Sequence, residues 1–142
     1  MLLSELPHME EKDAAMLNPL QLAYMGDVVW EMMVRFRLIL LHKNVHHMHT
    51  ECVNSVNAAS QAKNLERIRP ILSETEEHIV QRGRNAHARH PAPKNQSQAD
   101  YSEATGFEAL VGFLFLTGQS ERLREIDRLL FGELPEWEPV HS

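Results

Sequence analysis

Apolar residues recur at intervals of three and four along nearly the whole chain, the spacing that places them on one face of a helix. No segment alternates apolar and polar residues between turn residues, as a strand would. Chains of about 100–200 residues usually form a single domain. The sequence therefore predicts an all-α fold in one domain over residues 1–142, with a core at about 18–131, flexible N-terminal residues and a flexible C-terminal tail.

Capping residues predict where the first helices begin. Asn18 precedes a proline and predicts a long helix at about 19–41, since asparagine caps free N–H groups and proline is favoured at the first helical position. Asn44 predicts the start of a second helical region, which Pro70 ends. This region is expected to break near residues 52–57.

A capping box predicts the next helix. Ser73 and Glu76 form its S-x-x-E pattern, and the helix is expected to end near Gly83. The segment 84–98 contains two prolines and no apolar periodicity, so we expect a solvent-facing loop there.

Two helices are expected after that loop. The segment 99–117 is apolar on almost all sides in its second half and predicts a central core helix, with Gly118 as its C-terminal cap. An amphipathic closing helix follows at 121–131.

Charge is distributed unevenly along the chain. The chain has 14 Lys and Arg against 20 Asp and Glu, and its net charge of −6 argues against a polyanionic partner. The segment 78–99, however, lacks acidic residues and contains Arg82, Arg84, Arg89 and Lys94. This segment is therefore the candidate contact for phosphate groups.

The sequence predicts a cytoplasmic protein without a membrane span. Its single cysteine, Cys52, cannot form an internal disulfide, and the first residues lack the pattern of a secretory signal. The longest apolar stretch, 20–41, contains four charged residues, whereas a span needs about 20 mostly uncharged ones. We interpret Cys52 as a buried helix residue, and His42, His46, His47 and His49 as surface or interface residues rather than zinc ligands.

Two carboxylates stand in apolar surroundings, Asp27 in LQLAYMGDVVWEMMV and Glu108 in GFEALVGFLFL. Small residues flank both, so two helix backbones can approach closely and bring the carboxylates together. A pair of oxygen ligands with few protein partners suits Mg²⁺ or Mn²⁺. The alternative is structural, with Asp27 on a helix surface and Glu108 paired with Arg35 or another buried base.

Four motifs in order resemble the Mini-ribonuclease III branch of the ribonuclease III superfamily, over about residues 18–131. They are LAYMGDVVWE at 22–31, RGRNA at 82–86, PKN at 93–95 and YSEATGFEALVGFLFL at 101–116. The resemblance implies the all-helical ribonuclease III endonuclease-domain fold, without a double-stranded-RNA-binding domain, in a homodimer. It also implies Mg²⁺-dependent cleavage of double-stranded RNA to 5′-phosphate ends, in maturation of large-subunit (23S) ribosomal RNA precursors, with a ribosomal protein or pre-ribosome as a further candidate partner.

The resemblance assigns roles to particular residues. Asp27 and Glu108 fall on the family's catalytic, metal-binding acids, whereas Ala23 and Thr105 stand where larger members have further acids. Glu31 is a nearby acid that would act through water. The expected RNA contacts are Arg82, Arg84, Asn85, Arg89, Lys94 and Asn95.

Two other functions compete with this one. The absent acids leave open a catalytically silent helical dimer that binds structured RNA as an adaptor. A helical protein-interaction module ranks last, because it leaves the acid-free segment unexplained.

Overall fold

The computed structural model describes residues 3–86 and 97–139. Within these ranges all regular structure is helical, which confirms the all-α prediction. The α-helices are α1 (Glu11–Ala15), α2 (Pro19–Leu40), α3 (Val45–Val56), α4 (Ala58–Ile68), α5 (Glu74–Ala86), α6 (Gln98–Leu116) and α7 (Ser120–Phe131), and two short 3-10 helices lie at Leu3–Glu5 and Arg69–Ile71. None of the described helices has the length and apolar composition needed to cross a membrane.

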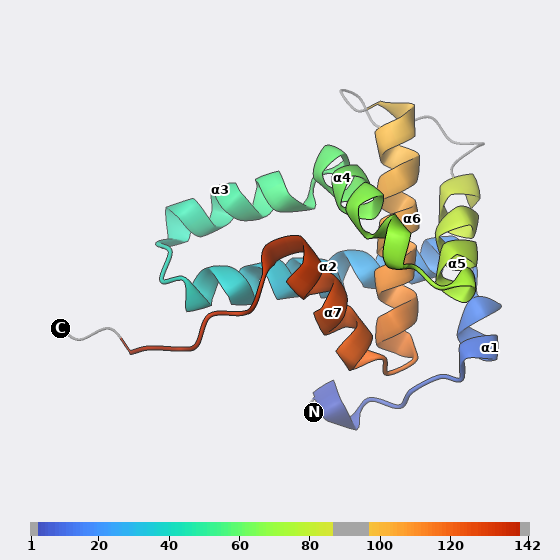
Figure 1. Cartoon of the computed structure of the whole chain (residues 1–142), viewed down its shortest axis with the longest axis horizontal. Coiled ribbons are helices and arrows are strands. Elements are labelled where there is room, and N and C mark those ends of the chain that lie inside the picture. Colours follow the sequence, from blue (N-terminus) through green and yellow to red (C-terminus); the bar gives the residue numbers. More distant parts are fainter. Residues whose placement is uncertain (1–2, 87–96, 140–142) are drawn as a thin grey trace.

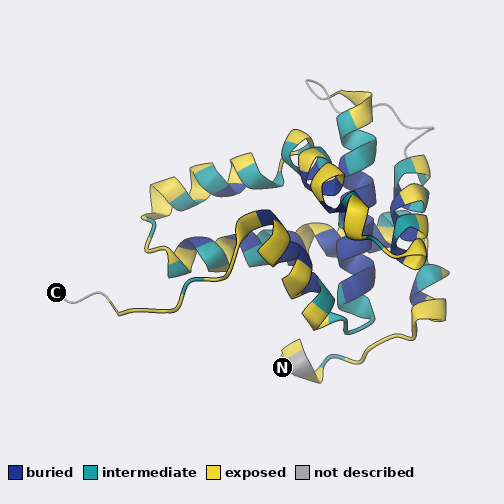
Figure 2. Cartoon of the chain, viewed as in Figure 1, coloured by how far each residue is buried: buried dark blue, intermediate teal, exposed yellow. Residues whose placement is uncertain are grey.

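Helix α6 is the centre of the molecule, as its apolar composition predicted. Helices α2, α4 and α5 pack around it, and Figure 1 shows it standing across α2. Its middle turns are the most deeply buried part of the chain (Figure 2). Phe107 packs edge-on against Trp30 of α2, with ring centroids 5.0 Å apart. This packing fixes the crossing of α2 and α6.

The predicted caps are present. The Asn18 side chain accepts from the Leu20 N–H at the start of α2, and the Asn44 side chain accepts from the His47 N–H at the start of α3. Asn57 caps α4 and is the break expected in the second helical region. Ser73 and Glu76 exchange both hydrogen bonds of the capping box.

The predicted end of α5 at Gly83 is wrong, because the helix continues to Ala86. A Cβ atom at Gly83 would lie 2.9 Å from the Gly106 Cα, so this glycine permits close packing of α5 on α6. Arg84 and Asn85 are therefore helical and not part of a loop. The rest of the predicted loop lies mostly outside the described residues.

The ends of the described chain are attached to the helical core. The Met9 N–H donates to the Leu116 carbonyl at the end of α6, and Ala14 is fully buried. At the other end, Arg37 of α2 donates to the Phe131, Gly132 and Glu133 carbonyls. Core packing thus extends to Ala14, before the predicted core begins.

Candidate active site

Helices α2 and α6 are in backbone contact where they cross. A Cβ atom at Gly26 would lie 1.7 Å from the Glu108 carbonyl oxygen, and one at Gly112 would lie 1.9 Å from the Leu22 carbonyl oxygen. Any side chain at either glycine would force the helices apart. The close approach expected from the small residues is therefore present, and it places Asp27 beside the turn that bears Glu108.

Asp27 and Glu108 line one pocket of about 350 Å³. Helix α2 contributes one wall, α6 another, and the junction of α3 and α4 the third. The lining residues are Leu20, Ala23, Tyr24, Asp27, Val56, Asn57, Ala58, Tyr101, Ala104, Thr105 and Glu108. The two acids were predictable from the sequence, but the contributions of Tyr24, Asn57 and Tyr101 were not, because these residues come from three parts of the chain that meet only in the fold.

Neither carboxylate has a hydrogen-bond or ion-pair partner among the described residues. Burial, and then the charge of Asp27, raises the pKa of Glu108 from 4.5 to about 8. Burial, and then the charge of Glu31, raises the pKa of Asp27. Arg35 pairs instead with Glu31, at 3.2 Å, so the alternative in which Arg35 neutralises Glu108 is not observed.

This donor set fits a divalent cation. Both unpaired side chains offer carboxylate oxygens, the ligands that Mg²⁺ prefers in proteins. A cation between them would offset the negative charge of Asp27, which adds to the effect of burial on the pKa of Glu108, and would favour the ionised form of both carboxylates. No group of three or more His, Cys, Asp or Glu suited to a metal occurs in the described part of the chain, so protein ligands would fill only part of the cation's shell.

Comparison with known proteins identifies the fold and its lineage. Residues 20–119 match the ribonuclease III domain. The chain is 47% identical over 111 residues to Mini-ribonuclease 3 of Symbiobacterium thermophilum, covering 78% of this chain and 85% of the relative. The chain belongs to the Mini-ribonuclease 3 group of the ribonuclease III family. It is accordingly an endoribonuclease specific for double-stranded RNA, a phosphodiester hydrolase.

Further relatives extend the similarity. Mini-ribonuclease 3 of Thermoanaerobacter is 44% identical over 112 residues, covering 78% of each chain. A crystal structure of a Fusobacterium nucleatum protein superimposes with a TM-score of 0.75 at 26% identity, covering 82% of this chain and 94% of the other. The ribonuclease III family is generally Mg²⁺-dependent and binds double-stranded RNA, in agreement with the donor set and the acid-free segment.

The predicted RNA contacts of this Mini-ribonuclease 3 homologue are placed in part. Arg82 donates to the Ala15 and Leu17 carbonyls and so attaches α5 to the segment before α2. Arg84 pairs with Glu103 of α6, and Asn85 accepts a hydrogen bond from Gln81. Arg89, Lys94 and Asn95 lie outside the described residues.

The histidine cluster lies away from the pocket lining. The His42 ring stacks on Trp137 of the C-terminal segment, with centroids 4.8 Å apart, and His46, His47 and His49 are exposed on α3. In the ranges that the structure covers, these residues form no metal-binding group.

Proposed function

We propose that Asp27 and Glu108 are the catalytic residues and hold Mg²⁺, or Mn²⁺ in its place, for hydrolysis of the RNA backbone. The observation that carries this assignment is the pair of unpaired carboxylates facing one pocket at a backbone-to-backbone helix crossing. An ion held there would supply Lewis-acid activation of the scissile phosphate and of water, and hydrolysis would leave a 5′-phosphate product. Asp27 would hold the ion from α2, and Glu108 would hold it from α6.

No protein nucleophile takes part in this mechanism. Burial raises the pKa of the Cys52 thiol, which disfavours the thiolate. The thiol donates weakly to Glu31, at 3.7 Å, and Glu31 also accepts from Arg35. These contacts make a structural role for Glu31 at least as natural as its proposed action through water.

The RNA-contacting segment begins on the last turn of α5 and continues through the residues up to α6. A-form RNA is contacted mainly through phosphates and 2′-hydroxyls. We propose Arg84, Asn85, Arg89, Lys94 and Asn95 for these contacts. Arg82 is the weakest candidate, because its guanidinium already donates to two carbonyls.

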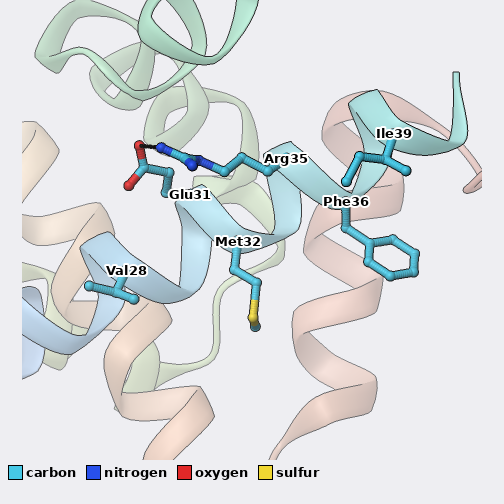
Figure 3. Close-up of a pocket in the computed structure, with 6 residues that line it drawn as sticks. All are labelled: Val28, Glu31, Met32, Arg35, Phe36 and Ile39. Atoms are coloured by element: carbon cyan, nitrogen blue, oxygen red, sulfur yellow. Dashed lines mark hydrogen bonds and ion pairs between the residues drawn. The ribbon is translucent and has the colours of Figure 1, made fainter. Parts of the chain in front are cut away.

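A homodimer forms through the outer face of α2 in this proposal. Val28, Met32, Phe36 and Ile39 project from successive turns of that helix and are 59%, 42%, 58% and 52% exposed. Figure 3 shows them in a row on one helix, beside the Glu31–Arg35 ion pair. A continuous apolar stripe of this kind marks a protein interface more than a solvated surface.

The proposed cellular task is maturation of the ends of the 23S ribosomal RNA precursor in the cytoplasm, with a ribosomal protein or pre-ribosome as a further partner. Residues 1–142 form one catalytic domain in this proposal, with its core at about 18–131 together with Ala14. Relatives that are Mini-ribonucleases 3 support a ribonuclease of this group, and the precursor itself follows from the family resemblance.

The test is incubation of the purified protein with an end-labelled RNA duplex in Mg²⁺, in EDTA, and as Asp27→Asn in Mg²⁺. We expect internal cutting only by the wild type with metal. A folded wild-type protein that shifts the duplex on a gel but never cuts it with Mg²⁺ or Mn²⁺ would favour the adaptor function.

A further inference from the structure

We propose that the pocket binds its divalent cation weakly in the free protein and that phosphate oxygens of the RNA duplex complete the ion's shell. Metal and RNA then bind cooperatively, and Ala23 and Thr105 are the residues that set this coupling. The inference rests on the proposed function, because it takes Asp27 and Glu108 as the metal ligands.

The pocket offers few ligand atoms to a cation. Asp27 and Glu108 are the only acidic residues in its described lining. Mg²⁺ takes six oxygen ligands in octahedral geometry and is held in proteins by one or two carboxylates with several waters. At least two positions of the shell therefore remain for water or a substrate oxygen.

Ala23 and Thr105 occupy the places from which a third and fourth ligand would come. Ala23 precedes Asp27 by one turn of α2, Thr105 precedes Glu108 by about one turn of α6, and both line the pocket. Ala23 has no ligand atom. The Thr105 hydroxyl donates to the Tyr101 carbonyl at 2.9 Å and stays directed along its own helix.

Asn57, another polar residue of the pocket, is also committed to local contacts. Its side-chain oxygen accepts from the Ser60 N–H at 2.9 Å, and its amide nitrogen donates to the Val53 and Asn54 carbonyls. Turning this side chain toward a metal would uncap α4. The amide therefore does not compensate for the absent acids.

Charge favours RNA as the missing ligand. Two carboxylates only balance the charge of a dication, so the occupied site has no net negative charge to repel a phosphate, as it would with a third or fourth acid. The pocket volume of about 350 Å³ accommodates a hydrated ion and a phosphate group together, since a water occupies about 30 Å³. Because coupling is reciprocal, RNA would tighten metal binding by the same factor by which metal tightens RNA binding.

The experiment measures Mn²⁺ binding by the loss of the electron paramagnetic resonance signal of free aqueous Mn²⁺. Mn²⁺ is titrated into the protein alone and into the protein with short RNA fragments. The fragments are the products left after the protein has cut a duplex to completion, so they carry phosphates but are no longer cut. If the protein does not cut the duplex, the intact duplex takes their place. Mn²⁺ bound by RNA alone is subtracted. Glu108→Gln is the matched control, because it keeps the RNA-contacting segment and removes one ligand.

We expect RNA to tighten Mn²⁺ binding to the wild type by a factor within about 5–150, the usual range of coupling between sites. Glu108→Gln is expected to show no such change. Equal Mn²⁺ affinity of the wild type with and without RNA overturns the inference even if the protein cuts RNA. If RNA tightens Mn²⁺ binding as expected but the protein does not cut RNA, the proposed function is contradicted instead.

Variants test the role of the two neutral residues. Ala23→Asp and, separately, Thr105→Asp should tighten Mn²⁺ binding to the free protein about tenfold or more and reduce the effect of RNA. Ser120→Asp, on an exposed turn at the start of α7, adds the same charge outside the pocket and should change neither value. An unchanged Mn²⁺ affinity in a folded Ala23→Asp protein would overturn the role assigned to Ala23. If Ala23→Asp does not fold, Thr105→Asp provides the same test.

Discussion

Two regions of the molecule differ in whether their carboxylates have arginine partners. Where α7 packs on the core, Asp127 is bound by Arg37 at 2.7 Å, and Glu76 is bound by Arg122 through both of its oxygens. At the crossing of α2 and α6, Asp27 and Glu108 have no such partner among the described residues. Carboxylates with arginine partners hold helices together, whereas unpartnered carboxylates keep their oxygens available for a ligand.

The pKa values follow the same division. Although burial acts to raise it, hydrogen bonds from Arg122 and Ser73 leave the pKa of Glu76 below its usual value. Burial and the charge of Asp27 raise the pKa of Glu108 to about 8. Removing charge should therefore weaken stability in the first region and activity in the second.

The largest expected effect is on catalysis at the unpaired site. Asp27→Asn should lower the cleavage rate by about a thousandfold or more, equivalent to about 4 kcal/mol of barrier, because the metal loses one of two protein ligands. Thermal stability in EDTA should be unchanged or higher, since a repulsive charge is removed. Initial rates on a labelled duplex measure the cleavage rate, and thermal melts measure the stability. Near-normal cleavage by Asp27→Asn would contradict a catalytic role for the unpaired carboxylate.

The reverse outcome is expected at the paired site. Asp127→Asn should lower the free energy of unfolding by about 3 kcal/mol, because it leaves the largely buried Arg37 without its counter-charge. Cleavage per folded molecule should stay within a few-fold of wild type. Urea denaturation and rates corrected for the folded fraction measure the two quantities, and a stable but inactive variant would contradict the assignment.

The helix crossing itself can be perturbed. Gly112→Ala places a methyl group 1.9 Å from the Leu22 carbonyl oxygen and should cost about 2–3 kcal/mol of stability, with reduced cleavage as the carboxylates separate. Gly83→Ala is the matched control at the α5–α6 contact, where the nearest atoms are 2.9 Å away or more. Equal loss of cleavage per folded molecule in both variants would show that the crossing does not position the acids specifically.

A smaller effect is expected on the pH dependence of stability in EDTA. Because folding raises the pKa of Glu108 from 4.5 to about 8, the native state binds more protons in this window, and stability should fall as pH rises through it. Between pH 5 and 8 the free energy of unfolding of the wild type should fall by an amount on the order of 1–2 kcal/mol, and Glu108→Gln should remove this fall. Parallel melting profiles for wild type and variant would argue against an uncompensated carboxylate.

Much of the fold and part of the candidate site were predictable from local sequence. The caps at Asn18, Asn44 and Ser73 act through neighbouring residues, so their patterns located the helices correctly. The convergence of Asp27 and Glu108 followed from small residues, which predicted the close approach of α2 and α6. Their lack of a partner did not follow, since pairing of Glu108 with Arg35 or another base was an open alternative. The arginine partners of Asp127 and Glu76 did not follow, since these contacts span 90 and 46 residues of sequence.

Gly83 and Arg82 show why the rest could not be predicted. A glycine near the end of an amphipathic segment suits either a helix end or a close helix contact, and only Gly106 on the facing helix decides between them. An arginine in a basic segment suits RNA contact, but Arg82 meets carbonyls from residues 15 and 17. Both outcomes depend on neighbours far away in sequence.

The most direct test compares Glu108→Gln with Glu76→Gln in one Mg²⁺-dependent cleavage assay, at equal concentrations of folded protein. Both changes replace a carboxylate by its isosteric amide, one in the unpaired region and one in the paired region. We expect loss of cleavage in Glu108→Gln with retained stability, and lowered stability with near-normal cleavage in Glu76→Gln. Cleavage that survives Glu108→Gln, or that is lost equally in both folded variants, would contradict this expectation.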